Sequence, residues 1–310
     1  MASTPQSVVR PVIQGQLGRT RPDIAGMVFS AILLLSLLFS LAIIGILLGD
    51  QLTRAMPVFI ERGTDFLTSP LSSNPANAGV AQGIVGTALL ATLVALIAFP
   101  IGILTAVYLE EYAGANALTR FIDINIRNLA GVPSVVYGLL GLAIFVTAFA
   151  TLGIGNGRNV LTGGLTLAVL ILPLVIITSA EAIRSVPTTL REGGFGLGAS
   201  RWQVVRGLVL PAAVPGILTG TVLALARALG ETAPLIVVGA VLGSFSTGGS
   251  IAELLTGPYT ALPVIVYDWA RKPQEEFRAL TSAAIIVLLV VTFVINAVAV
   301  ILRNRYDRRW

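Results

Sequence analysis

Residues 192–211 read EGGFGLGASRWQVVRGLVLP, a glycine-rich polar loop that runs directly into a long apolar segment. Positions 193 to 196 hold three glycines, although each glycine in a helix interior costs about 1 kcal/mol relative to alanine. Glycine also lets another backbone approach closely. The pattern predicts a short helix, a turn at Gly198 and a second helix with Ser200 as its N-cap. We therefore expect this loop to meet a protein partner; a plain amphipathic helix lying at the membrane surface is the alternative.

Long apolar runs lie on both sides of this loop. The 310 residues are 55% hydrophobic and 11% charged, with a mean hydropathy of +0.89, whereas a soluble domain is usually about 25% charged. Six runs reach the length of about 18 apolar residues that a transmembrane helix needs. They are residues 27–49, 83–109, 129–152, 163–181, 208–230 and 279–302. The fold class is therefore predicted as an all-α polytopic membrane protein with six transmembrane helices, the first of them retained because it is too long for a signal-peptide core.

Two shorter stretches are also apolar. Residues 233–245 lie between Pro234 and a Gly/Ser-rich segment, and we expect them to form a broken or re-entrant continuation of the fifth span, buried in protein. The segment 263–277, PVIVYDWARKPQEEF, predicts a surface helix outside the membrane. Its Tyr267 and Trp269 are expected at the membrane interface, where such side chains are enriched.

The distribution of Lys and Arg predicts the orientation. Of these 20 residues, 13 lie in segments that would share one side of the membrane, namely 1–26, 110–128, 182–207 and 303–310. Because cytoplasmic loops carry the excess of positive charge, both termini are predicted to be cytoplasmic. The expected organisation is a cytoplasmic tail (1–26), a first transmembrane helix (27–49), an extracytoplasmic loop (50–82), a helical core (83–302) with a cytoplasmic loop at 185–206, and a basic cytoplasmic tail (303–310).

The chain contains no cysteine and no histidine. This excludes disulfides, Cys/His metal sites, thiol nucleophiles and imidazole bases. An intramembrane hydrolase therefore lacks a plausible base, and we predict no catalytic residue and no metal ligand. The G-x-x-x-x-G-K-[ST] pattern of an ATP site is also missing from the sequence, so we expect no ATP site of the chain's own.

Arg227 and Glu231 stand in an otherwise apolar setting, LALARALGETAPLI, at residues 223–236. Residues four apart share a face of a helix, and an Arg in mid-membrane costs about 2.5–3.5 kcal/mol on insertion scales. Counted from Ala212, Arg227 lies 15 residues, or about 22 Å, along the helix, in the outer half of the membrane. Gly230 and Pro234 are expected to loosen or break the helix just beyond it. Intramembrane ionisable residues are functional by default, but an ion pair that only fixes helix packing is the alternative.

Other polar residues in the spans are weaker candidates. Ser134 and Tyr137 offer polar atoms to a path beside a kink at Pro133, although glycine and serine at this density more often indicate close helix packing. Glu181 and Arg184 lie three residues apart at the end of the fourth span. They predict an ion pair at the cytoplasmic edge rather than a gate.

The loop quoted first resembles the loop signature of permease subunits of binding-protein-dependent ABC importers. The matching residues are Glu192-Gly193-Gly194, then Gly198, then Leu208-Val209-Leu210-Pro211. The family has Glu-Ala-Ala, a Gly and an apolar-x-Leu-Pro at these places, so Gly-Gly here replaces Ala-Ala. The resemblance covers roughly residues 83–302 and implies the type I ABC importer permease fold. It also implies that the loop docks on an ATP-hydrolysing subunit through the coupling residues Arg191, Glu192, Gly198 and Arg201.

Within that family the chain resembles the phosphate-transporting branch. The similar pieces are GIVGT with VYLEEYAG, AGVPSVVYGLLG, GASRWQVVRGLVLPAAVPGILTG and ARALGETAPL. The resemblance implies that phosphate passes Arg227, because a guanidinium is a planar fork that matches phosphate oxygens and stays charged. Glu231 would hold the Arg when the path is closed and repel an anion that lingers. Thr232 and Ser134 would add hydroxyl groups to the path.

The resemblance further implies a set of partners and a location. The partners are a PstC-like permease subunit, two ATP-binding PstB-like subunits that also hold Mg²⁺, and an extracytoplasmic PstS-like phosphate-binding protein. The chain would be a non-enzymatic half of the pore in the bacterial cytoplasmic membrane. Two alternatives stay open: an importer of another oxyanion such as sulfate or molybdate, and an ion-coupled secondary carrier with Glu231 as its proton site. The carrier predicts an inverted repeat, which the sequence does not show.

Overall fold

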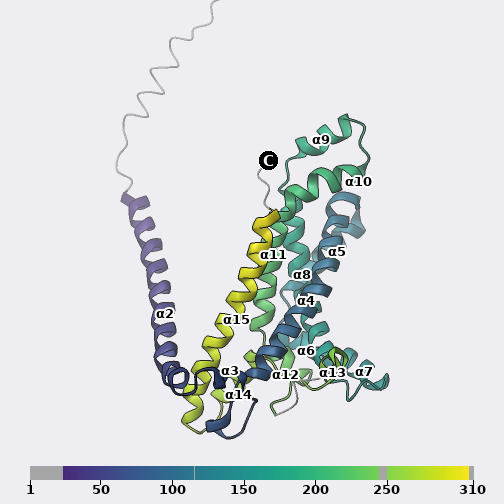
Figure 1. The fold of residues 1–310 in the computed structure, drawn as a ribbon. Helices are drawn as coiled ribbons and strands as arrows, with labels where there is room; N and C mark the ends of the chain where they lie inside the picture. The colour runs from purple at the N-terminus through teal and green to yellow at the C-terminus, as the bar shows by residue number, and fades with distance from the viewer. Residues whose placement is uncertain (1–23, 115, 244–249, 307–310) are drawn as a thin grey trace, which may run out of the picture. The chain divides into compact units, whose positions relative to one another are not determined.

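The computed structural model describes residues 24–114, 116–243 and 250–306, and within them every regular element is a helix. In chain order (Figure 1) the α-helices are α2 (Ile24–Arg62), α3 (Thr64–Thr68), α4 (Ala81–Val107), α5 (Ala117–Ala130), α6 (Ser134–Gly141), α7 (Thr147–Thr151), α8 (Val160–Arg184), α9 (Thr188–Gly196), α10 (Arg201–Val204), α11 (Leu210–Gly230), α12 (Ala233–Val237), α13 (Ile251–Thr256), α14 (Leu262–Ala270) and α15 (Glu276–Tyr306). The shorter elements are a 3₁₀ turn, η1 (Pro75–Asn77), and three π-helical turns, η2 (Tyr108–Tyr112), η3 (Leu142–Val146) and η4 (Val205–Val209).

Within the described part of the chain, six helical stretches are long and apolar enough to cross a membrane, as predicted. They are Ile24–Arg62, Ala81–Tyr112, Ser134–Thr151, Val160–Arg184, Arg201–Gly230 and Glu276–Val298. The third begins at Ser134 rather than at residue 129, because Pro133 has extended backbone and separates α5 from α6. The fifth begins at Arg201 rather than at residue 208, because η4 joins α10 to α11 without a break. The chain is an all-α, multi-pass membrane protein.

Two compact units make up the chain, Met1–Asp50 and Gln51–Trp310. The described part of the first unit, residues 24–50, is helical, and its large apolar side chains are exposed. So much exposed apolar surface is stable only against lipid or another protein. The described residues do not include 1–23 and 307–310 of the predicted tails, nor 244–245 of the predicted re-entrant stretch.

In the second unit, α8 is the central helix and packs against both α4 and α11 (Figure 1). Small residues allow the backbones of α4 and α11 to lie close to α8. A Cβ added to Gly102 of α4 would lie 2.6 Å from the side chain of Val175, and one added to Gly220 of α11 would lie 2.4 Å from that of Thr178. Close packing of this kind holds helices together in lipid, where no hydrophobic driving force acts between them.

The end of this unit that carries α14 has an aromatic core. Trp269 packs against Phe66 and Phe277, with ring centroids 6.4 and 5.7 Å apart, and only 2% of its surface is exposed. The prediction that Trp269 lies at the membrane interface is therefore wrong. Tyr267, also on α14, is 46% exposed. The predicted helix is present as α14, but its Trp269 side chain is buried in the aromatic core.

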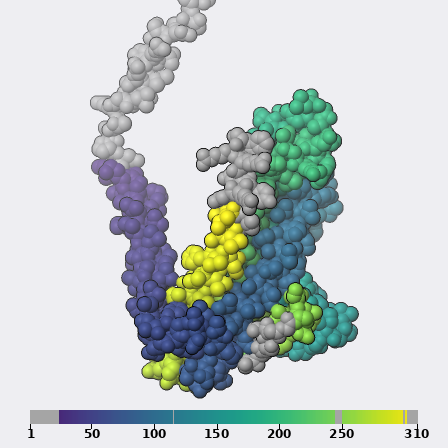
Figure 2. Space-filling model, in the orientation of Figure 1, coloured from purple at the N-terminus to yellow at the C-terminus, as the bar shows by residue number. Residues whose placement is uncertain are grey.

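The opposite end carries α9 and α10, which protrude from the helical bundle (green in Figures 1 and 2). Val204 of α10 and Val209 of the following η4 are buried and pack in one cluster with Ala106 of α4 and Ile183 of α8. We call this region, made of residues 108–112 and 184–206, the loop end. Its apolar core joins the protruding helices to the ends of the long ones.

Candidate functional site

The loop end has the helix–turn–helix geometry that the sequence predicts. α9 ends at Gly196, and Gly198 has a φ of +81°, a conformation that favours glycine. Ser200 caps α10: its hydroxyl accepts from the Gln203 N–H, and the Gln203 side chain accepts from the Ser200 N–H. Both predicted roles, the turn at Gly198 and the cap at Ser200, are confirmed.

The crowded glycines of α9 divide into two kinds. A Cβ added to Gly194 would lie 2.8 Å from Val204 and 3.0 Å from Leu208, so this glycine lets α9 pack on its own second helix. Gly193 and Gly196, by contrast, have nothing within 4 Å of an added Cβ. Their open side is where a second chain's backbone has room to approach.

The four predicted coupling residues fall into two groups, those without an ion pair or ring contact in the described part of the chain and those with one. Glu192 and Gly198 are exposed on the outer surface of the loop, and the neighbouring Leu197 is 91% exposed. Arg191 turns inward and binds Glu111, while Arg201 stacks over the ring of Tyr112 at 5.7 Å from its centroid. The outer surface thus offers a carboxylate, open backbone and an apolar side chain to a partner. Arg191 is bound within the chain, whereas Arg201 is exposed.

Arg184 has a different partner from the predicted one. Its Nε and Nη2 donate to Glu110 at 3.2 and 2.5 Å, so the carboxylate comes from η2 and not from Glu181 on the same helix. The prediction of a Glu181–Arg184 pair is therefore wrong. Glu110 and Glu111, which sequence reasoning missed, lie in the fragment YLEEY, where two carboxylates directly follow an apolar span.

Arg227 and Glu231 form a loose pair at the broken end of α11. The helix ends at Gly230, and Glu231 has extended backbone (φ −78°, ψ 121°), so the two residues do not share a helix face as predicted. Arg227 Nε lies 3.8 Å from Glu231 Oε1, which is an ion pair but too long for a hydrogen bond. The Arg227 side chain is 51% exposed and that of Glu231 19%. The guanidinium thus keeps donors available for an anion.

The other two predicted path residues lie at the starts of two short helices. Thr232 is half-buried and precedes α12, and Ser134, also half-buried, begins α6. α6 packs on α12 so closely that a Cβ added to Gly138 would lie 2.8 Å from Cα of Pro234. Tyr137 donates its hydroxyl hydrogen bond to the carbonyl of Leu129 at 2.9 Å, so its polar atom serves the chain's own backbone.

The stretch after α11 is a broken continuation of that helix, as far as it is described. α12 is short, the backbone turns at Gly239 with a φ of +97°, and the Val241 N–H then donates to the carbonyl of Tyr259 at 2.7 Å. Tyr259 is fully buried beside Gly163, and this burial raises the pKa of its hydroxyl, which stays protonated. The segment is therefore held against protein.

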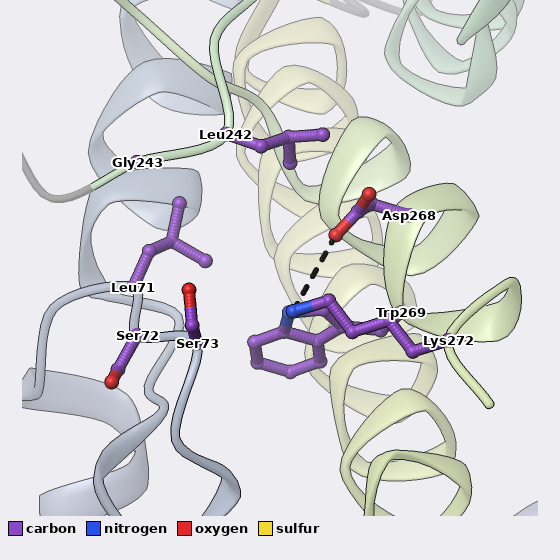
Figure 3. Close-up of a pocket in the computed structure, with 8 residues that line it drawn as sticks. All are labelled: Leu71, Ser72, Ser73, Leu242, Gly243, Asp268, Trp269 and Lys272. Atoms are coloured by element: carbon purple, nitrogen blue, oxygen red, sulfur yellow. Dashed lines mark ion pairs between the residues drawn. The ribbon is translucent and has the colours of Figure 1, made fainter. Parts of the chain in front are cut away.

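A second polar site lies at the α14 end. A cavity of about 250 Å³ is lined by Leu71, Ser72, Ser73, Leu242, Gly243, Asp268, Trp269 and Lys272 (Figure 3). Lys272 Nζ lies 3.8 Å from Asp268 Oδ2 and 3.9 Å from the centroid of the Phe277 ring. A carboxylate and an aromatic face therefore already balance its charge, which makes this cavity a weaker anion site than Arg227.

The family follows from the sequence of the core. Residues 98–310 match the family described as binding-protein-dependent transport system inner membrane component. The chain belongs to this family. This agrees with the resemblance carried by the loop end and with the arrangement of six long apolar helices.

Named relatives cover most of the chain. The phosphate transport system permease protein PstA of Yersinia pestis is 34% identical over 280 residues, which span 89% of this chain and 86% of that protein. PstA 1 of Mycobacterium tuberculosis (strain ATCC 25618 / H37Rv) is 34% identical over 231 residues, 74% and 71% of the two chains. The probable ABC transporter permease protein YqgH of Bacillus subtilis (strain 168) is 36% identical over 270 residues, 81% and 84% of the two.

Solved structures of ABC importers share the fold. A bacterial alginate ABC transporter in complex with an alginate pentasaccharide-bound periplasmic protein aligns with a TM-score of 0.60, covering 91% of this chain and 94% of that chain at 18% identity. The MetNI methionine ABC transporter in an inward-facing conformation aligns with a TM-score of 0.59, covering 74% and 96% at 18% identity. At this identity the likeness shows the fold alone, and it confirms the predicted type I ABC importer permease fold.

Proposed function

We propose that this chain is the PstA-type permease subunit of an ATP-driven importer that moves inorganic phosphate across the bacterial cytoplasmic membrane. The relatives named as phosphate transport permeases support the substrate. One structural observation supports it further: the half-exposed, loosely paired guanidinium of Arg227 at a helix break. A planar fork of N–H donors suits the oxygens of a phosphate ion.

The proposed complex assigns ATP hydrolysis to other subunits. Two PstB-like subunits would bind ATP and Mg²⁺ and dock on the outer surface of the loop end, at Glu192 and Gly198. A PstC-like subunit would complete the pore, and a PstS-like protein would deliver phosphate from outside. The support is the family itself and the exposed surface of α9 and its turn. The chain would then be a channel half and not an enzyme.

Arg227 and Glu231 have complementary roles in the proposed path. An anion that reaches Arg227 competes with a carboxylate at 3.8 Å, a distance at which no hydrogen bond has to be broken. When the anion leaves, Glu231 compensates the charge of the guanidinium again. Its own negative charge opposes a second anion at the same place. Thr232 directly precedes α12, and Ser134 begins α6, the helix that packs on α12.

Uptake by the reconstituted complex tests the substrate and the energy source. The tagged chain is purified with its bound subunits, the subunits are identified, and labelled phosphate uptake is measured in liposomes containing ATP. We expect uptake that requires ATP hydrolysis and the binding protein, with sulfate and molybdate competing weakly. Uptake preferring sulfate or molybdate would assign another oxyanion. Uptake driven by an ion gradient, with a non-hydrolysable ATP analogue in place of ATP, would indicate a secondary carrier.

Cysteine labelling tests the proposed orientation, since the native chain has no cysteine. Ser200→Cys places a thiol on the exposed loop end, and Ser73→Cys places one on the exposed part of the predicted extracytoplasmic loop. With a membrane-impermeant thiol reagent on intact cells, we expect labelling of the Ser73→Cys chain and labelling of the Ser200→Cys chain only after lysis. The reverse pattern would place the loop end and both termini outside.

A further inference from the structure

Three consecutive residues of η2, the turn that directly continues α4, each contact one arginine of the loop end. The pairs are Glu110–Arg184, Glu111–Arg191 and Tyr112–Arg201. The arginines lie before α9, within α9 and at the start of α10. One turn of η2 thus holds the loop at three points along its length, through contacts between residues far apart in the sequence.

The Glu111–Arg191 pair is the most buried and the most fully bonded of the three. Arg191 donates from Nε and Nη2 to Glu111 Oε1 at 3.0 and 2.7 Å. It also donates from Nη1 to the carbonyl of Val186 at 2.7 Å and from Nη2 to that of Ile183 at 2.9 Å. The exposed fractions of the Arg191 and Glu111 side chains are 19% and 9%. Charge-assisted bonds in a partly buried place are the strong kind.

The other two pairs are weaker. The Arg184 side chain is 56% exposed, so water screens its pair with Glu110. Arg201 stacks on Tyr112 at 5.7 Å, a contact worth little at an exposed position. Arg191 also differs from them because its carbonyl partners belong to the last turn of α8 and the residues just after it. Cations near a helix C-terminus are favourable, so Arg191 joins α4, α8 and α9 at a single point.

We propose that Glu111 and Arg191 form a strut that fixes α9 to the ends of α4 and α8, so that the loop and these two helices move as one rigid body. The inference rests on the proposed function, in which a subunit docked on the loop supplies the movement. Arg191 and Glu111 are then positioning residues, which transmit the movement without touching the ATPase. Without the strut, α9 would shift while α4 and α8 stayed in place.

Removing the charge of Glu111 tests the strut. Glu111→Gln keeps the size of the side chain, and we expect the phosphate moved per ATP hydrolysed to fall about tenfold, a typical coupling free energy. ATP hydrolysis itself should persist, because the outer surface of the loop is untouched. The matched control is Asp123→Asn, which removes an exposed ion pair with Arg127 on α5 and should leave the ratio unchanged. An assembled Glu111→Gln complex with the ratio of the unmodified complex would overturn the proposal.

A covalent replacement of the strut provides a sharper test. The double variant Glu111→Cys/Arg191→Cys is compared before and after treatment with a short bifunctional thiol reagent, in a complex without other reactive cysteines. Each single-cysteine variant is treated as a control. We expect the untreated double variant to be uncoupled and cross-linking to restore the ratio, since a rigid body tolerates a rigid link. If the cross-link stops transport or leaves the ratio low, α9 moves relative to α4 and the strut is wrong.

The two proposals fail in different ways. An unmodified complex that moves no phosphate contradicts the proposed function. An unmodified complex that moves phosphate with ATP, while Glu111→Gln behaves identically, contradicts the strut alone.

Discussion

The second unit contains two ion pairs that differ in almost every physical respect. At the loop end, Arg191 makes two hydrogen bonds to a carboxylate 80 residues away and two to backbone carbonyls. At the end of α11, Arg227 meets a carboxylate four residues away at 3.8 Å, without a hydrogen bond, and half of its side chain is exposed. The first guanidinium makes four hydrogen bonds within the chain, and the second is left with free donors.

For these two arginines, the surroundings in the fold indicate the role better than the sequence motif does. Arg191 lies inside the family's loop signature, yet the structure makes it part of the framework. Arg227 lies in an apolar helix, where a charge is costly, and it is not fully satisfied there. A transporter needs both kinds: a rigid connection that carries movement, and an open charge that a moving anion can meet and leave.

A bulky residue at Gly198, the turn of the loop, should have the largest effect on phosphate uptake. Gly198→Trp places an indole on the outer surface, where we propose that the ATPase docks, and uptake should be lost or assembly prevented. Gly153→Trp is the matched control, because Gly153 also has a positive φ (+75°) and open space around it but lies between α7 and α8. Both changes cost similar backbone strain, about 1–2 kcal/mol. Normal uptake by an assembled Gly198→Trp complex would show that the ATPase does not dock at this turn.

Replacing Arg191 should lower the free energy of unfolding much more than replacing Arg227. Arg191→Gln leaves the buried Glu111 unpaired and should destabilise the second unit by about 3 kcal/mol. Arg227→Gln removes only an exposed, loose pair and should cost less than about 1 kcal/mol. Chemical or thermal unfolding of detergent-solubilised protein measures both. Equal losses at the two positions would mean that Arg227 is a packing device like Arg191.

Removing the charge of Glu231, which faces Arg227, should have a smaller effect, on ATP hydrolysis in the absence of substrate. Glu231→Gln keeps the size of the side chain and removes the charge that compensates Arg227. We expect ATP hydrolysis in the absence of phosphate and binding protein to rise a few-fold, about 1 kcal/mol of lost gating. The control is Glu275→Gln, whose pair with Arg278 is highly exposed. If basal hydrolysis is the same in both variants and in the unmodified complex, Glu231 has no part in gating.

Features with a local cause could be predicted from the sequence. The six spans follow from runs of apolar residues, and the turn at Gly198 and the cap at Ser200 follow from the backbone needs of those positions. The break after Gly230 was expected too, although not that it would put Glu231 outside the helix. These features depend on residues a few positions apart, which a single sequence contains.

Features with a distant cause could not be predicted. Glu110 and Glu111 find their arginines 74 and 80 residues away, a pairing that no local pattern encodes. Trp269 was misplaced for the same reason, because its burial depends on Phe66, which lies far away in the chain. The loop signature gives Arg191 as a residue type, but the direction of its side chain, toward Glu111, depends on a contact 80 residues away. Packing between distant segments decides all three.

Phosphate uptake by Arg227 variants tests whether phosphate passes this residue. Reconstituted complexes matched for subunit content are compared, with Arg278→Gln as the control for loss of an exposed arginine. We expect Arg227→Gln to reduce uptake about a hundredfold, the worth of a charge-assisted hydrogen bond to the anion, and Arg227→Lys to transport poorly because a point charge replaces the fork. Near-normal uptake by a well-assembled Arg227→Gln complex would contradict the claim that phosphate passes this residue.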